Sequence, residues 1–275
     1  MSMAYDTDED IKLEYQENLL TPKQTAAQEA NLDMSYAGWS VDIANIDELP
    51  NDQFAIARRK GFGGSDSSIL LGVNPYTTLE ELIDQKSRDT LTEEEKAIGD
   101  KVAVRKGRDL EPLIISKFQK FFGLHTVKPK DMYRCDKFPY LTMNFDGITG
   151  VAGAYIPVEI KVVTARGERH YNPRNAIFIE GQGTFEYPED VTQRNLSIQS
   201  KAAHYGIPTY YYTQLQQEIA ASGASYGYLN TLYDKDWTMH TYFVHRDQTT
   251  INAIITQGFK AWQKVVEKNP ARKLD

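Results

Sequence analysis

The spacing of hydrophobic residues along this chain changes at Gly123, and this change restricts the folds open to it. Before Gly123, Leu110, Ile114 and Phe118 recur at steps of four, which predicts an amphipathic helix closed by that glycine. After it, short β-rich stretches separated by turn residues predict strands of one sheet over residues 124–164. We then expect helices over residues 190–206 and 209–222, paired strands over 225–234 and 237–246, and a closing helix over 248–268. This order is typical of an α/β or α+β sandwich.

Composition divides the chain into an extension and one main domain. Residues 1–45 carry many acidic and small residues, and we predict an N-terminal extension there. Residues 46–275 are then a single domain. Within it, residues 166–208 begin with a stretch rich in Gly, Pro, Asn and Glu, which predicts an insertion.

The charge and the apolar runs exclude some classes of protein. The net charge is −7, from 31 Lys and Arg against 38 Asp and Glu, which argues against a protein that coats nucleic acid through bulk positive charge. No apolar run approaches the roughly 20 residues of a membrane helix, and the acidic N-terminus lacks the apolar core of a secretory signal. The single Cys135 cannot form an internal disulfide. We therefore expect a cytoplasmic protein with no membrane partner.

Two acidic residues and a lysine form the most informative group in the sequence. In "PVEIKVV", Glu159 and Lys161 are two residues apart on a predicted strand, so they project to the same side. Asp146, in "MNFDGIT", precedes a glycine where a hairpin would bring it beside Glu159. Mg²⁺ is commonly held by one or two carboxylates, so this group favours a metal site. Taken alone, an exposed Glu-x-Lys pair on a polar strand face is the more ordinary interpretation.

The spacing of these residues resembles that of a known nuclease family. Asp146, followed about a dozen residues later by Glu159-x-Lys161, resembles the PD-(D/E)xK nuclease signature, with Phe145 where that signature has proline. Upstream, "RRKGFGGSDSSILLGVNPY" and "KGRDLEP" resemble the YqaJ-type viral recombinase family, to which the phage lambda exonuclease is similar. The resemblance runs from about residue 55 to about residue 220 and implies a restriction-endonuclease-like core, with a mixed central β-sheet flanked by helices.

The same resemblance implies the roles of individual residues. Asp146, Glu159, Glu111 and the backbone carbonyl of Ile160 would hold Mg²⁺, for which Mn²⁺ would substitute. Lys161 would act with them on the water or the phosphate. Further active-site residues are implied by "GRDLEP" and "YYYTQLQQE": Glu111, and Gln214 near the attacking water. Asn144, two residues before Asp146, would face the same way and contact phosphate. For Glu111, an acidic residue in the first turn of a helix is also stabilising on its own.

The glycine-rich stretch "RRKGFGGSDSSILLG" admits three interpretations, and two of them fail. A dinucleotide fingerprint requires a third glycine where Asp66 stands, and a nucleophile elbow requires a glycine where Ser67 stands. An anion pocket at a helix start remains. By the family resemblance, Arg58 and Ser65 would hold a DNA 5′-phosphate, with Arg59 as a weaker candidate. The alternative is a tight turn flanked by solvated arginines.

These observations together predict a metal-dependent deoxyribonuclease. By resemblance it is a phage-type exonuclease that degrades double-stranded DNA from 5′ to 3′ and leaves 3′ single-stranded tails for recombination. The resemblance also implies double-stranded DNA ends as substrate, a trimeric ring, a single-strand annealing protein as partner, and a bacterial or phage-infected cell as location. Two alternatives stay open: an endonuclease or nickase on the same core, and a DNA- or protein-binding module that keeps the fold without cutting.

Overall fold

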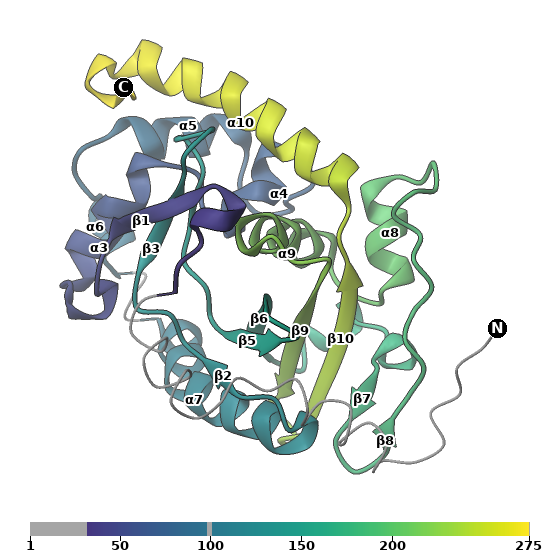
Figure 1. Cartoon of the computed structure of the whole chain (residues 1–275). Helices are drawn as coiled ribbons and strands as arrows, with labels where there is room; N and C mark the ends of the chain where they lie inside the picture. Colours follow the sequence, from purple (N-terminus) through teal and green to yellow (C-terminus); the bar gives the residue numbers. More distant parts are fainter. Residues whose placement is uncertain (1–31, 98–100, 275) are drawn as a thin grey trace.

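The computed structural model describes residues 32–97 and 101–274 of the chain (Figure 1). The helices are α3 (Asn51–Ala57), α4 (Ser67–Leu70), α5 (Leu79–Ser87), α6 (Glu93–Lys96), α7 (Val102–Phe122), α8 (Ile198–His204), α9 (Thr209–Ser222) and α10 (Gln248–Lys268). The strands are β1 (Trp39–Ile43), β2 (Thr126–Val127), β3 (Met132–Cys135), β4 (Thr142–Met143), β5 (Ile148–Val151), β6 (Ala154–Val163), β7 (Phe178–Ile179), β8 (Gly183–Thr184), β9 (Tyr226–Tyr233) and β10 (Met239–His245). Among the short 3₁₀ turns, η4 (Gly64–Asp66) directly precedes α4.

A mixed seven-stranded sheet forms the centre of the molecule, in the order β2-β5-β6-β9-β10-β7-β8. Only β6 and β9 pair in parallel among these described strands, and their neighbours are antiparallel. Helix α7 covers one face and α9 the other, with α10 lying beyond α9 (Figure 1). The alternation of the strands divides their side chains between the two faces: Tyr228 and Phe243 pack with α7, whereas Leu229 and Val244 pack with α9.

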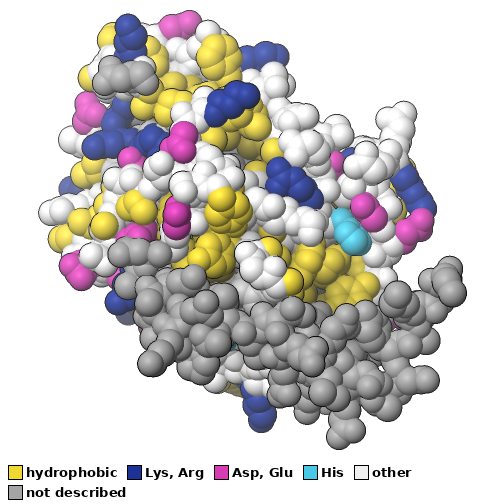
Figure 2. Space-filling model, in the orientation of Figure 1, with side chains coloured by type: hydrophobic (Ala, Val, Ile, Leu, Met, Phe, Trp, Pro, Cys, Tyr) yellow, Lys and Arg dark blue, Asp and Glu magenta, His cyan; other side chains and the backbone are white. Residues whose placement is uncertain are grey.

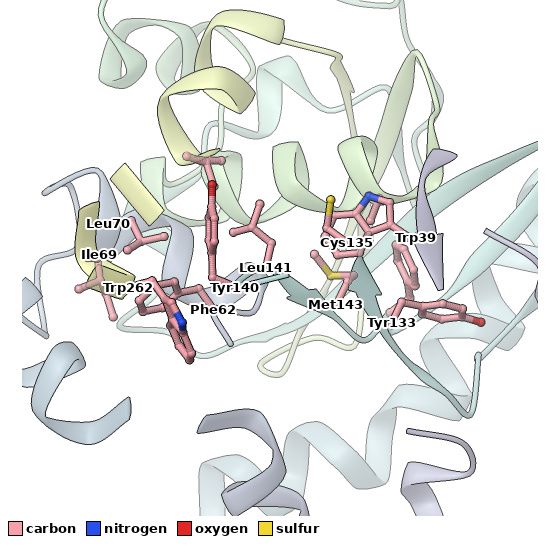
Figure 3. Packing of buried hydrophobic residues seen from close by; sticks show 14 of the residues in the cluster. Trp39, Phe62, Ile69, Leu70, Tyr133, Cys135, Tyr140, Leu141, Met143 and Trp262 are labelled. Carbon is pink, nitrogen blue, oxygen red and sulfur yellow. The ribbon is translucent and has the colours of Figure 1, made fainter. Parts of the chain in front are cut away.

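A second core joins a small three-stranded sheet, in the order β1-β3-β4, to α4, α5 and α10. Phe62 and Trp262 meet edge to face, with ring centroids 5.4 Å apart, at one end of this cluster (Figure 3). At its other end lie Trp39, Cys135 and Met143. Helix α9 lies between the two cores, because its Ala221 packs in this cluster while its Leu215 and Ile219 pack against the large sheet.

The prediction of one sheet over residues 124–164 is wrong. Strands β3 and β4 belong to the small sheet, while β2, β5 and β6 belong to the large one. The stretch "YLTMNFDGITG" contains two short strands, β4 and β5, and residues 144–147 cross between the sheets. Alternation reports which side chains are buried but not which strand pairs with which, so the sequence pattern could not separate the two sheets.

The structure also changes the description of two predicted segments, the N-terminal extension and the insertion at residues 166–208. Strand β1 pairs with β3 through Trp39 and Cys135, and Trp39 is only 4% exposed, so residues 39–43 belong to the folded unit and not to an extension. Residues 1–31 of the predicted extension lie outside the described residues. The segment 166–208 is more than a loop, because β7, β8 and α8 lie in it and β7 extends the large sheet by pairing with β10.

The surface carries both signs of charge side by side. Figure 2 shows Lys and Arg interspersed with Asp and Glu over the described part of one face. Of the helices within residues 32–97 and 101–274, none has the length and apolar character needed to cross a bilayer.

Candidate active site

The β5–β6 hairpin brings Asp146 to Glu159. Asp146 lies just before β5, and the pairing of β5 with β6 sets it beside residues 159 and 160. The N–H of Val158 donates to the carbonyl of Gly147 at 2.9 Å, and the N–H of Ile160 donates to Oδ2 of Asp146 at 3.2 Å. The predicted proximity of the two acidic residues is therefore present in the structure.

The ammonium group of Lys161 lies where three oxygen atoms meet. It donates hydrogen bonds to Oε1 of Glu159 and, at 3.1 Å, to the carbonyl of Ile160. Its Nζ is 3.6 Å from Oδ2 of Asp146. The family resemblance implies these three oxygens, together with those of Glu111, as the ligands of a metal ion. The hairpin thus directs two carboxylates and one carbonyl toward a common positive charge.

Burial changes the protonation of this group. Glu159 is 1% exposed, and desolvation, followed by the charge of Asp146, raises the pKa of its carboxyl to about 7. Burial alone would lower the pKa of Lys161, but the negative charges of Glu159 and Asp146 outweigh it and raise that pKa. Lys161 therefore stays protonated at neutral pH, and a neighbouring cation favours the ionised form of Glu159.

Helix α9 supplies the amide of Gln214. Its Nε2 donates to Oε1 of Glu159 at 2.5 Å and to Oε1 of Glu218 at 3.1 Å. Glu218, one turn further along α9, is 1% exposed, and desolvation, together with the charge of Glu159, raises its pKa well above the ordinary value. Sequence analysis did not select Glu218, although its place four residues after Gln214 on a predicted helix was the available signal.

Glu111 reaches the same region from α7. The helix begins at Val102, so Glu111 lies in its interior and the explanation by a first-turn dipole effect is wrong. The Nζ of Lys128 is 2.9 Å from its Oε1. Desolvation and then the charge of Asp146 raise the pKa of Glu111, so the two carboxyl groups interact electrostatically.

The donor set fits a hard divalent cation. Within residues 32–97 and 101–274, no three His, Cys, Asp or Glu side chains gather into a metal-binding group by themselves. The oxygens of Asp146, Glu159 and Ile160 that converge on Lys161 are two carboxylates and a carbonyl, the ligand types that Mg²⁺ takes when it also keeps several waters. The raised pKa of the buried Glu159 supports the fit, because a neighbouring cation would favour its ionised form.

The glycine-rich loop packs closely against the site. A Cβ on Gly64 would lie 3.2 Å from Cγ of Gln214, and one on Gly61 would lie 2.5 Å from Cγ2 of Thr142. These two glycines therefore permit a close approach of the backbone. The loop continues into η4 and α4, in agreement with the short helix start inferred for the anion pocket.

Arg58 and Ser65 meet across this loop. Nη2 of Arg58 donates to Oγ of Ser65 at 3.0 Å, and its guanidinium carbon lies 5.8 Å from the ring centroid of Phe54. Behind them, Asp66 receives a hydrogen bond from the N–H of Gly63 at 2.9 Å and pairs with Lys86 at 2.7 Å. A guanidinium and a hydroxyl held together in this way can both donate to a phosphate.

Arg59 and Asn144, the two other predicted phosphate contacts, lie in different surroundings from each other. Arg59 is 2% exposed, and its guanidinium donates to Glu95 at 2.6 Å and to the carbonyls of Arg88 and Thr90. It anchors the α6 region, and we leave it out of the phosphate pocket. Asn144 is half-buried two residues before Asp146, with the buried Phe145 between them. This arrangement agrees with Asn144 and Asp146 facing the same way.

Comparisons with known proteins concern the family and the fold of the chain. The YqaJ-like viral recombinase domain matches residues 53–225. An uncharacterized protein, YqaJ of Bacillus subtilis, is 29% identical over 124 residues, which are 45% of this chain and 37% of that protein, so the match covers little more than a third of the relative. The crystal structure of an alkaline exonuclease from Laribacter hongkongensis is similar at a TM-score of 0.52 and 14% identity, over 79% of this chain and 94% of that one. The expected restriction-endonuclease-like core, a mixed sheet flanked by helices, is thereby confirmed.

Proposed function

The chain belongs to the YqaJ-like viral recombinase domain family, and from this premise we propose that it is a metal-dependent deoxyribonuclease. In this proposal it is a phage-type exonuclease that degrades double-stranded DNA from 5′ ends and leaves 3′ single-stranded tails. The observation that supports it most is the convergence of Asp146, Glu159 and the Ile160 carbonyl on one positive charge. A module that only bound DNA would gain little from buried carboxylates beside a phosphate, because like charges repel.

Each side chain has a part in the proposed hydrolysis. Asp146, Glu159 and the Ile160 carbonyl would hold Mg²⁺, with Glu111 nearby, and the bound ion would supply a Lewis acid for attack on the phosphodiester. Lys161 keeps its proton because its pKa is raised, so it serves as a donor that orients water or stabilises phosphate charge rather than as a base. Gln214 holds the Glu159 carboxylate through a direct hydrogen bond and borders the place of the attacking water.

The phosphate pocket would set the direction of degradation. Arg58 and Ser65 carry two donors suited to a terminal 5′-phosphate, and Gly64, between them in the loop, lies against Gln214 of α9. An enzyme that grips the 5′-phosphate begins at that end of a strand. By family resemblance we extend the proposal to a trimeric ring, a single-strand annealing partner and a cytoplasmic location.

The choice of substrate tests the proposal. Linear duplexes with 5′-phosphate or 5′-hydroxyl ends are compared with closed circular DNA in Mg²⁺, in Mn²⁺ and in EDTA. We expect degradation of the phosphorylated linear duplex with either metal, slower degradation of the 5′-hydroxyl duplex, and intact circles. Cutting of circles would favour an endonuclease or nickase instead. Inertness toward all substrates, together with DNA binding, would favour a binding module.

Variants test the residues. Lys161→Ala and Glu159→Ala are expected to lose about 100-fold or more of the cleavage rate, the loss typical when a transition-state donor or ligand is removed. Lys260→Ala, at an exposed position on α10, is the matched control and should cleave like the wild type. Circular dichroism verifies the fold of each. Wild-type cleavage by both folded site variants would end the proposed mechanism.

A further inference from the structure

A row of tyrosines leads from the surface to Lys161. Tyr76 is 73% exposed, and its ring centroid lies 5.9 Å from that of Tyr210. Tyr210 lies 4.5 Å from Tyr211, and Nζ of Lys161 is 5.2 Å from the centroid of the Tyr211 ring. We name Tyr76, Tyr210 and Tyr211 the tyrosine row. The proposed hydrolysis uses none of its members.

Tyr76 is held in place although its side chain is exposed. Oδ1 of Asn74 accepts hydrogen bonds from the N–H of Tyr76 at 2.8 Å and of Thr77 at 3.0 Å. The side-chain amide of Asn74 donates to Oγ of Ser68 at 2.8 Å, which ties the turn to α4. An aromatic ring presented to solvent from a braced turn loses little conformational freedom when a ligand packs on it.

Helix α9 aligns the row with the site. Tyr210 and Tyr211 precede Gln214 by one turn, so they share its side of the helix, and Gln214 contacts Glu159. Both tyrosines are half-buried. Tyr212, which points the other way, is fully buried, and its hydroxyl donates to Asp247 at 2.8 Å. Core packing therefore accounts for Tyr212 but not for the exposed end of the row.

From this arrangement we propose that the tyrosine row is a stacking surface for nucleobases of the strand held at the active site, with Tyr76 as its outermost ring. The inference rests on the proposed nuclease function and deepens it. Every nucleobase has a π-face, so stacking on aromatic rings accepts any sequence. Phosphates would lie on the side of Lys161 and Arg58, and the bases would turn toward the tyrosines.

Binding of a fluorescent oligonucleotide tests the proposal. The probe is a short 5′-phosphorylated single strand with 2-aminopurine at one of its first three positions, bound to the full chain in EDTA so that no cleavage occurs. With the wild type we expect quenching of the fluorescence, as stacking requires, at one or more positions. Tyr76→Ala should lose that quenching and bind about 5- to 150-fold more weakly, the range that stacking of one base implies. Tyr76→Phe, which keeps the ring, should behave like the wild type.

A control and a kinetic measurement separate stacking from general damage. Phe259 is another exposed aromatic residue, 53% exposed on α10, where it neighbours Tyr140 and not the row. Phe259→Ala should leave binding and quenching unchanged. In steady-state cleavage with Mg²⁺, Tyr76→Ala should raise KM and keep kcat, because Tyr76 lies away from the reacting atoms.

Three results would overturn the inference. Wild-type quenching and affinity in Tyr76→Ala would show that the ring takes no base. An equal loss in Tyr76→Phe would assign the effect to the hydroxyl. A wild-type protein that cleaves DNA but quenches no probe position would remove the stacking surface and leave the nuclease proposal intact. If the wild type cleaves no DNA with Mg²⁺ or Mn²⁺, the proposed function itself fails, and this inference fails with it.

Discussion

Replacing Glu159 by Gln should change how the stability of the metal-free protein depends on pH. Burial raises the pKa of this carboxyl from an ordinary 4.5 to about 7 in the folded chain. Between those two pH values the folded chain binds a proton that the unfolded chain has lost, so stability falls as pH rises. Below pH 4.5 the contribution is fully present, and above pH 7 it is gone. At about 1.4 kcal/mol per pKa unit, the wild type loses about 3 kcal/mol of its free energy of unfolding across that interval because of this group.

Urea unfolding in EDTA at pH 5 and pH 8 measures this effect. The free energy of unfolding of the wild type should fall between the two conditions by about 2–3 kcal/mol more than that of Glu159→Gln. At pH 8, Mg²⁺ should raise the unfolding midpoint of the wild type more than that of Glu159→Gln, because the substitution removes one of the two carboxylates proposed to hold the ion. The reasoning is refuted if the two proteins show the same pH dependence.

Three further substitutions test the packing around the site. Gly61→Ala should destabilise the chain by about 1–3 kcal/mol in urea unfolding, because the new Cβ would lie 2.5 Å from Cγ2 of the buried Thr142. The added substitution Thr142→Ser should recover part of this loss, whereas an unchanged midpoint in Gly61→Ala would show that the loop accommodates the Cβ without strain. Gly107→Ala, in the interior of α7 with no atom within 4 Å of the new Cβ, should instead stabilise it by about 0.5–1 kcal/mol, seen as a higher Tm, and a lower Tm would contradict the helix there. Asp66→Asn should lower the stability of the fold by about 3–5 kcal/mol, because it leaves the 4% exposed Lys86 without the carboxylate that lies 2.7 Å from it. The double variant with Lys86→Met should recover most of this loss in thermal unfolding, and a single variant as stable as the wild type would refute the prediction.

Local patterns were sufficient to predict the elements on which the site is built. The alternation around Glu159 and Lys161 predicts β6: Val158 and Ile160 pack in the core on the α7 side, and Glu159 is buried on the other side, against α9. The helical spacing that ends at Gly123 predicts the end of α7, where that glycine has a positive φ of 67°. In each case the signal is carried by neighbours within a few residues.

Features that depend on distant partners could not be predicted. Arg59 lies beside Arg58 in sequence, yet its guanidinium is buried by Glu95 and two carbonyls from residues 88–90, which no local pattern records. Desolvation and then the charge of Glu159, on another element, raise the pKa of Glu218. The division of residues 124–164 between two sheets depends on β1, which lies about 90 residues before β3 in the chain.

The parallel pairing of β6 with β9 determines when the proposed active site can assemble during synthesis of the chain. Glu159 lies opposite Leu229, and α9, which carries Gln214, is made between the two strands. Strand β6, which carries Glu159, is therefore synthesised well before helix α9 and strand β9, which enclose it. Long-range parallel pairing is also slow to form. If the chain cuts DNA as proposed, a ribosome-bound fragment ending before β9 should be inactive toward DNA.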